Sequence, residues 1–327
     1  MRPYFVLALG LTAVSTAVLF IRYAQADGVP SLAIAAVRLT LSTLILLPVA
    51  LSRHRPALRA LPARSWMLVA ISGVFLGVHF ATWITSLRYT TVTNSTVFVS
   101  ASPIFVALIA RLFLRETLSN NTVFGLFVTV GGSVIIAFSD ACTWEGGCRP
   151  FAETLQGGTL MGDGLALVGA AAVAVYLVIG RRVRQGLDLV PYITLTYGAA
   201  AISLVVACLV TGTPILGYAP DAYLWLALLA LVPQTIGHTS FNWALKHLPA
   251  TFVSVATLGE PILSSALALR VLQETPTPVK LVGGAVVLLG IALSMRGDAA
   301  KQKESGSDTP PPIDDQPPGS GARSSEA

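Results

Sequence analysis

Ten long apolar stretches, separated by short polar connections, run along the chain. They cover roughly residues 4–22, 31–50, 66–87, 91–111, 122–138, 163–180, 190–210, 222–245, 250–270 and 278–296. Most have about the 20 residues that a helix needs to cross a hydrocarbon core at about 1.5 Å per residue. The pattern predicts an all-α integral membrane protein with ten transmembrane helices.

The two halves of the chain repeat each other at a constant offset of 158 residues. The matched positions include Pro103 and Pro261, Glu116 and Glu274, Gly125 and Gly283, and Gly132 and Gly290. Each half holds five apolar stretches, and because five is odd, the second half enters the membrane in the opposite orientation. We therefore expect two inverted five-helix repeats, an arrangement typical of alternating-access transporters.

These repeats predict the domain boundaries. The first repeat covers residues 1–139, an outer loop covers 140–162, and the second repeat covers 163–296. Residues 297–327 are rich in Pro, Ser, Gly, Asp and Glu, which is typical of a disordered cytoplasmic tail. Arg2, an apolar stretch and Ala24-Gln25-Ala26 also resemble a cleavable signal, but cleavage would leave nine helices, so we expect the segment to stay.

Composition supports a membrane protein, because 54% of the residues are hydrophobic and only 11% are charged. The formal net charge is +5, yet the basic residues lie in short connections, so no nucleic-acid partner is expected. With the N-terminus inside, fifteen basic residues fall on the inner side and five on the outer side. This bias predicts that both termini face the cytoplasm, and we expect the protein in the plasma (inner) membrane.

Two charged residues fall inside predicted helices, Arg38 in 31–50 and Glu260 in 250–270. A charge at the centre of a membrane helix costs about 2.5–3.5 kcal/mol, so it is paired or it faces water. Two interpretations stay open. The residues form a mutual salt bridge that only fixes packing, or at least one of them faces a substrate cavity.

His79 and His238 occupy nearly matched places in the two repeats, close to the membrane midplane. A neutral histidine can simply make one interhelical hydrogen bond, but it can also bind or relay a proton. Glu260 and His238 are therefore the candidates for proton coupling. Together with Trp83, Asn94 and other polar residues, they predict a mixed apolar and hydrogen-bonding cavity. The substrate-binding candidates are Arg38, His79, Trp83, Asn94, His238, Asn242 and Glu260.

Prolines and glycines add structural predictions. Pro103 and Pro261 should kink their helices, because proline removes a backbone hydrogen bond. Gly125 and Gly132, and their matches in 278–296, should pack helices closely and could serve a homodimer contact. Gly73 and Gly77 carry the same packing signal. Cys142 and Cys148, in the outer loop, are either bridged or free thiols, and Cys208 is expected to pack inside a helix.

No motif for nucleotide binding, metal binding or catalysis is present, so we expect no enzyme activity, no metal and no cofactor. Two other classes of membrane protein are compatible with parts of the sequence. In a haem protein, His79 and His238 would be the axial ligands, which a visible spectrum would reveal. A non-transporting membrane sensor or scaffold would act through its loops and tail.

Several segments resemble the EamA family of the drug/metabolite transporter superfamily. In the first half they are Ser-Leu-Arg-Tyr-Thr-Thr (86–91), Ala-Ser-Pro-Ile-Phe-Val-Ala-Leu-Ile-Ala (101–110) and Phe-Leu-Arg-Glu-Thr-Leu (113–118). In the second half they are Ala-Leu-Lys-His-Leu-Pro-Ala (244–250), Gly-Glu-Pro-Ile-Leu-Ser-Ser (259–265) and Val-Leu-Gln-Glu-Thr-Pro (271–276).

The resemblance implies ten helices in two inverted repeats around a central cavity, and secondary transport, often export, of amino acids or other small metabolites. It also implies that Glu116 and Glu274 are scaffold residues at helix ends. We therefore expect an exporter of small polar or zwitterionic metabolites. Arg38 would hold or balance a carboxylate, and Glu260 an amine or a coupled proton.

Overall fold

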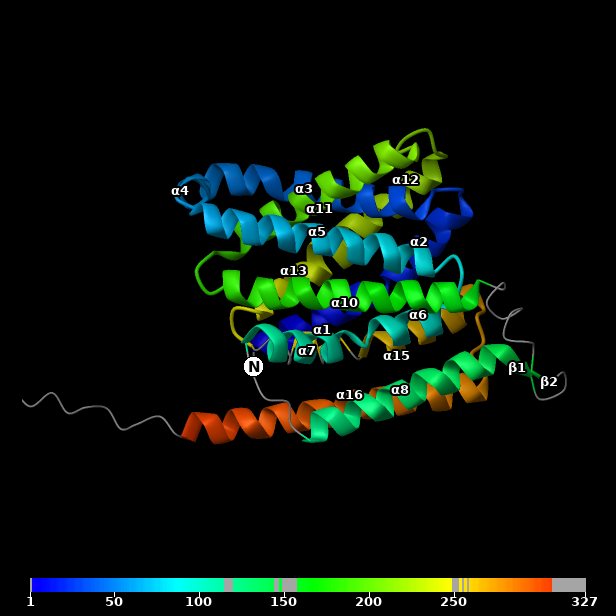
Figure 1. The fold of residues 1–327 in the computed structure, drawn as a ribbon. Coiled ribbons are helices and arrows are strands. Elements are labelled where there is room, and N and C mark those ends of the chain that lie inside the picture. Colours follow the sequence, from blue (N-terminus) through cyan, green and yellow to red (C-terminus); the bar gives the residue numbers. More distant parts are fainter. Residues whose placement is uncertain are drawn as a thin grey trace, which may run out of the picture.

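The computed structural model describes residues 2–114, 120–143, 147–148, 158–248, 253–254, 256–257 and 259–307. The described part is a bundle of long helices that run roughly side by side (Figure 1). In the first half the elements are α1 (Arg2–Ser15), α2 (Ala17–Ala26), α3 (Ser31–Arg53), α4 (Arg55–Arg59), α5 (Ala63–Ser86), α6 (Val92–Val99), α7 (Ser102–Leu114) and α8 (Asn120–Ala141).

The second half is similar in content. It holds α10 (Thr159–Val183), α11 (Leu189–Thr211), α12 (Pro220–Leu229), the π-helix η1 (Ala230–His238), α13 (Thr239–Ala244), α15 (Gly259–Leu267), the π-helix η2 (Ala268–Leu272) and α16 (Pro278–Ser307). In Figure 1, α3, α5 and α11 form one edge of the bundle, and α8 pairs with α16 at the opposite edge. Helices α1, α6, α7, α10 and α15 lie between these edges.

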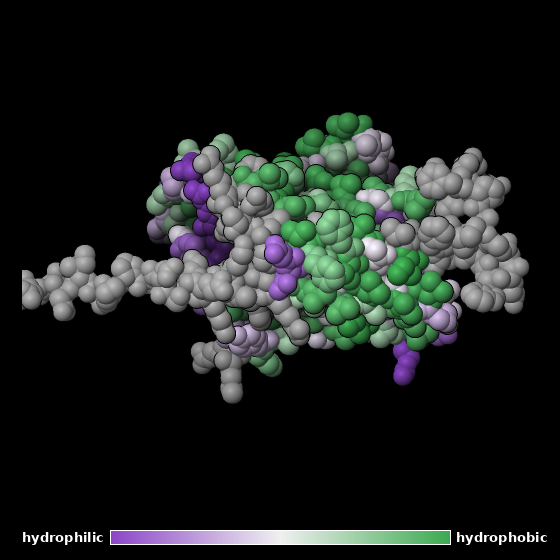
Figure 2. All heavy atoms as spheres, turned by 60° about the horizontal axis from the view of Figure 1, so that its bottom comes forward, coloured by the Kyte–Doolittle hydropathy of each residue, from purple (hydrophilic) through white to green (hydrophobic). Residues whose placement is uncertain are grey.

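The surface is apolar where a soluble protein would be polar. Phe5, Leu112, Phe127 and Val210 each expose at least 70% of their area. Figure 2 shows hydrophobic side chains over the middle of one face, while strongly hydrophilic side chains gather near one end. Burial by lipid accounts for such a surface, because lipid does not penalise exposed apolar side chains as water does.

Within the described residues, seven helical segments are long and apolar enough to cross a membrane, and two apolar helices in α8 and α16 are shorter. The predicted stretch 250–270 includes residues outside the described part. The structure therefore establishes a multi-pass helical protein and leaves the number ten as a prediction.

The described elements add detail to the predicted loop and tail. Residues 142–143 and 147–148, in the predicted outer loop, form a two-residue antiparallel strand pair, β1 (Cys142–Thr143) and β2 (Gly147–Cys148), and the fold class remains all-α. Their backbones set Cys142 opposite Cys148, and a bridge between them stays a prediction. Residues 297–307 belong to α16, because Ala299, Ala300 and the Lys and Gln residues that follow favour a helix. The rest of the predicted tail and Glu116 lie outside the described residues.

Glycines allow the closest helix contacts. A Cβ on Gly132 would lie 2.7 Å from the Val287 nitrogen, and one on Gly290 would lie 2.6 Å from the Thr129 nitrogen. A Cβ on Gly73 would lie 2.5 Å from the Ala199 Cβ, so α5 packs against α11 in the same way. Gly132 and Gly290 thus join α8 to α16 within one chain, which means that these faces are not available to a second copy.

Candidate functional site

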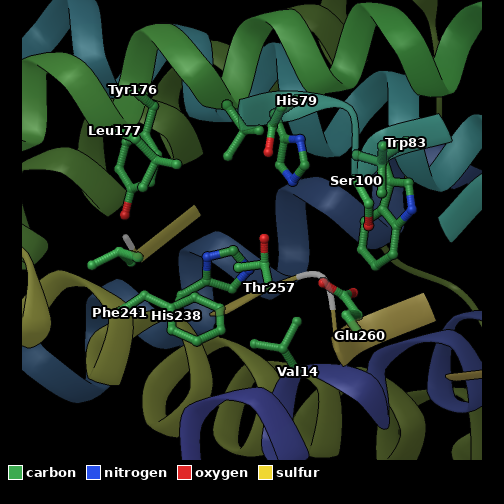
Figure 3. Close-up of a pocket in the computed structure, with 14 residues that line it drawn as sticks. Val14, His79, Trp83, Ser100, Tyr176, Leu177, His238, Phe241, Thr257 and Glu260 are labelled. Carbon is green, nitrogen blue, oxygen red and sulfur yellow. The ribbon is translucent and has the colours of Figure 1, made fainter. Parts of the chain in front are cut away.

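A cavity lies between the two halves of the bundle, and helices from both halves supply its wall. The lining residues are Val14, His79, Trp83, Val99, Ser100, Ser102, Val173, Tyr176, Leu177, His238, Phe241, Val253, Thr257 and Glu260. The cavity volume is about 50 Å3, which is room for a few water molecules in the conformation described. In Figure 3, Trp83, Ser100 and Glu260 lie on one side, and Tyr176 and Leu177 lie on the other.

Glu260 brings a carboxylate to this wall. It is the second residue of α15, and its backbone N–H donates to the Thr257 carbonyl at 2.9 Å, which anchors the start of the helix. The residue is 8% exposed, and among the described residues no donor lies within hydrogen-bond range of the carboxylate. Among the described lining residues, Glu260 is the only one with a carboxyl group and none is a lysine or arginine, so an ionised Glu260 would dominate the electrostatics of the cavity.

His79 is fixed by a helix that approaches closely. Its Nδ1 bonds to the Gly169 carbonyl of α10 at 2.9 Å, so this nitrogen carries a hydrogen, because a carbonyl can only accept. A Cβ on Gly169 would lie 3.2 Å from Thr82 Oγ1, so a larger residue there would press against α5. The His79 ring also stacks on Trp83, with ring centres 5.9 Å apart and planes at 9°.

Tyr176 is a lining residue that the sequence predictions missed. Its hydroxyl donates to Asn242 Oδ1 at 2.6 Å, and Asn242 Nδ2 donates to the His238 carbonyl at 2.8 Å and to the Tyr197 hydroxyl at 3.2 Å. Asn242 is fully buried and is not part of the lining. It therefore positions Tyr176. The available signal was that Tyr176 is the single aromatic residue in the Ala- and Gly-rich stretch 162–180.

Arg38 lies one layer behind the cavity wall. Its Nε donates to Gln234 Oε1 at 2.7 Å, and its guanidinium carbon lies 4.0 Å from the centre of the Phe80 ring. Phe80 connects Arg38 to the cavity wall, because its ring centre lies 5.1 Å from that of His238, which is a lining residue. Among the described residues, Nη1 and Nη2 of Arg38 have no hydrogen-bond partner, and Arg38 makes no ion pair with Glu260. The structure therefore does not contain the direct Arg38–Glu260 salt bridge, which was one of the two interpretations of these charges.

The π-helix η1 places Gln234 and His238. Pro233 lies inside it and has no N–H to donate. The Ala230 carbonyl accepts hydrogen bonds from Ser42 Oγ at 2.9 Å and Thr235 Oγ1 at 2.7 Å. Such π-helical turns occur often at functional sites, since the wider turn changes which side chains face inward. The sequence predicted a regular helix across this region.

The prolines at matched positions lie at helix starts. Helix α6 ends at Val99 and α7 begins at Ser102, so Pro103 is the second residue of α7. Pro261 is the third residue of α15. The irregular backbone before each proline carries lining residues, Ser100 in the first half and Thr257 in the second.

Asn94 is also outside the lining. It is fully buried near the start of α6, where its backbone nitrogen donates to the Thr91 side chain at 3.3 Å. Its Nδ2 lies 3.4 Å from Asp163 Oδ1, which also accepts from the Thr90 hydroxyl at 2.9 Å. Asn94 thus helps to join α6 to α10. The cavity brings together His79, Trp83, His238 and Glu260, but not Arg38, Asn94 or Asn242.

An ion pair joins three elements at one end of the bundle. Arg22 of α2 donates to Glu274 Oε1 at 2.9 Å and to the Thr90 carbonyl at 3.1 Å. Glu274 Oε2 accepts from the backbone nitrogen of Val92, the first residue of α6, at 2.9 Å. Arg181 has a nearly matched place in the second half, one residue beyond the 158-residue offset, and donates to the Leu245 and Leu248 carbonyls at 2.7 and 3.2 Å. We refer to Arg22, Glu274 and the Val92 nitrogen as the end clasp.

The fold and the cavity define a class, the multi-pass helical membrane proteins with an internal cavity lined by both halves of the chain. A family model then identifies the chain: it belongs to the EamA-like transporter family, whose model matches residues 1–138 and again 160–296. The resemblance found in the sequence is confirmed, including its occurrence in two copies.

Relatives and a solved structure agree with this. An uncharacterized transporter, YyaM, of Bacillus subtilis is 26% identical over 70% of this chain and 72% of its own length. A probable terminal-alkyne amino-acid exporter of Streptantibioticus cattleyicolor is 25% identical over 64% of this chain and 66% of its own length. A crystal structure of a protein with 18% identity matches with a TM-score of 0.63 and covers 92% of this chain and 99% of that one, which supports the fold.

Proposed function

We propose that this protein is a secondary-active transporter of the plasma membrane that exports small polar or zwitterionic metabolites, such as amino acids. Ten helices in two inverted repeats would alternate access to the cavity, with both termini in the cytoplasm. The observation that carries the proposal is the carboxylate of Glu260, which faces an internal cavity built by helices of both halves. A buried carboxylate that has no hydrogen-bond donor among the described residues is costly in a membrane, and a substrate amine or a coupled proton would offset that cost.

We assign roles to the other candidate residues according to whether they line the cavity or lie behind its wall. His79, Trp83 and His238 line the cavity and contact the substrate or, for His238, the coupled proton. Arg38, from behind Phe80, balances the charge of Glu260 through space instead of binding the substrate. The relative named as a probable terminal-alkyne amino-acid exporter supports amino acids as the substrate class. We do not propose that this protein transports the same amino acid as that relative.

The end clasp supports alternating access. It ties α2 and α6 to the segment that follows α15, and Glu260 lies on α15 itself. Closing one end of the bundle with breakable ionic contacts is what a transporter requires, because that end must later open.

Transport itself is the first test. Vesicles with the purified protein should exchange labelled amino acids, and Glu260→Gln should reduce the rate by about tenfold or more, because it removes a charged partner of the amine. The matched control is Asp221→Asn, the same chemical change on an exposed residue outside the cavity, which should leave the rate unchanged. Normal transport in the Glu260→Gln protein would remove this residue from the mechanism.

The inverted topology has a direct test. Arg88 and Lys246 are matched across the repeats, and both are exposed. In a chain without its native cysteines, Arg88→Cys and Lys246→Cys should react with an impermeant thiol reagent from opposite sides of the membrane. Reaction from the same side would show parallel repeats and would reject alternating access by this architecture.

A further inference from the structure

Hydrogen-bond directions at the cavity wall show which ligand groups it can accept. The amide of Asn242 is oriented by its Nδ2, which must donate to the His238 carbonyl. Its Oδ1 therefore accepts, and the Tyr176 hydroxyl must be the donor in their 2.6 Å bond. The Tyr176 hydroxyl hydrogen is used in this bond, so only the lone pairs of that oxygen are left for a ligand.

Two other lining groups use their hydrogens in the same way. Thr257 Oγ1 donates to the Ser254 carbonyl at 2.5 Å, and His79 Nδ1 donates to the Gly169 carbonyl at 2.9 Å. What remains for a ligand is the lone pairs of the Thr257 oxygen and, in the neutral ring, the acceptor Nε2 of His79. Ser100, Ser102 and His238 can act in either direction.

The charges of the wall point the same way. No lysine or arginine is among the lining residues that the structure describes, and Glu260 contributes a carboxylate. The guanidinium of Arg38 is covered by the Phe80 ring and bonds to Gln234. Trp83, Tyr176 and Phe241 are also lining residues, and aromatic rings attract cations placed over their faces. An ammonium group supplies three donors to these acceptors. A carboxylate would find one group of the described lining that can only donate and has no partner there, the Nε1–H of Trp83, and would otherwise face the lone pairs of the Tyr176, Thr257 and Glu260 oxygens.

We infer that the cavity recognises the ammonium group of its substrate together with an apolar body, and makes no specific site for a carboxylate. Amines that lack the carboxylate of an amino acid are then ligands as good as the amino acid itself. This inference rests on the proposed transport function, because it specifies the substrate class of the same cavity.

Three probes that share the same apolar body separate the contribution of the ammonium group from that of the carboxylate. L-leucine has both groups, isoamylamine lacks the carboxylate, and 4-methylpentanoate lacks the amine. Binding to the full-length purified protein is measured by calorimetry. Isoamylamine should bind at least as tightly as leucine, and 4-methylpentanoate roughly tenfold more weakly or worse, because it loses a charge-assisted hydrogen bond. Isoamylamine affinity roughly tenfold below that of leucine would overturn the inference, as would equal binding of 4-methylpentanoate or no binding of any probe.

Variants locate the effect. Glu260→Gln should weaken isoamylamine binding by about tenfold or more, and the exposed control Asp221→Asn should not. Tyr176→Phe, which keeps the ring and removes one acceptor, gives a second measurement if Glu260→Gln does not fold, and it should also weaken isoamylamine binding. Unchanged amine affinity in both cavity variants would reject the assignment.

Counterflow in vesicles separates this inference from the transport proposal. If isoamylamine binds as expected but neither it nor leucine exchanges across the membrane, the substrate assignment stands and transport fails. If leucine exchanges while isoamylamine binds roughly tenfold more weakly, transport stands and the substrate assignment fails.

Discussion

Asn242 uses both ends of its amide group one layer behind the cavity wall. It holds the Tyr176 hydroxyl on one side and the His238 carbonyl and Tyr197 hydroxyl on the other. Each of these partners is buried, so the loss of Asn242 would remove a hydrogen bond from buried polar groups. At the scale of residues, the chemistry of the cavity therefore depends on a side chain that does not reach it.

We predict that Asn242→Ala lowers the free energy of unfolding by about 1–3 kcal/mol, since it leaves buried polar groups without partners. The measurement is thermal unfolding of the protein in detergent. Asn121→Ala, an exposed asparagine in α8, is the matched control and should change stability by less than about 0.5 kcal/mol. Equal stability of the two variants would show that the Tyr176 and Tyr197 hydroxyls find other partners.

Helices α8 and α16 depend on close backbone approach. Gly132 faces the Val287 nitrogen and the Gly283 carbonyl, while its neighbour Gly131 has no heavy atom within 4 Å of the place of a Cβ. The two glycines thus have the same local conformation and opposite surroundings. At the scale of elements, packing and not helix propensity explains Gly132.

We predict opposite effects for these neighbours. Gly132→Ala should destabilise the protein by about 1–3 kcal/mol, because the added methyl group meets backbone atoms that cannot move aside. Gly131→Ala should be neutral or stabilising by up to about 1 kcal/mol, because alanine favours helices. Unfolding in detergent measures both, and a loss of stability in Gly131→Ala as large as in Gly132→Ala would contradict the assigned faces.

At the scale of the whole molecule, the end clasp is an ion pair between residues that are far apart in the sequence. Arg22 and Glu274 are 252 positions apart, and each side chain is about 25% exposed. Lys246 and Asp188 form a second ion pair, but their side chains are 44% and 64% exposed and 3.6 Å apart. Solvent weakens this second pair, so only the clasp should affect how the bundle opens.

We predict that Glu274→Gln makes this end of the bundle more accessible. In a chain without its native cysteines, Ser95→Cys, buried in α6, should react with a thiol reagent severalfold faster when Glu274 is replaced, because α6 loses a contact at its first residue. Lys246→Gln is the control and should leave the rate unchanged. A rate that does not respond to Glu274→Gln would mean that packing alone closes this end.

The spacing of apolar residues and the repeated Pro, Glu and Gly positions were enough to predict a duplicated helical membrane protein of the EamA type. Lipid ties the sequence pattern closely to the fold, because each transmembrane segment must be apolar, long and internally hydrogen-bonded. The same reasoning found His79, Trp83, His238 and Glu260, since polar residues in apolar helices are rare enough to be informative.

Only the tertiary structure separates the wall of the cavity from the layer behind it. Arg38, Asn94 and Asn242 have the same sequence signal as the lining residues, but helix rotation and the π-helical turn of η1 direct them to Gln234, Asp163 and Tyr176. Tyr176 lines the cavity because a glycine-rich face of α10 lets that helix approach. The atoms that remain free to bind a solute are those without a hydrogen-bond partner inside the protein. Many of these partners are distant in the chain, so local sequence cannot predict them.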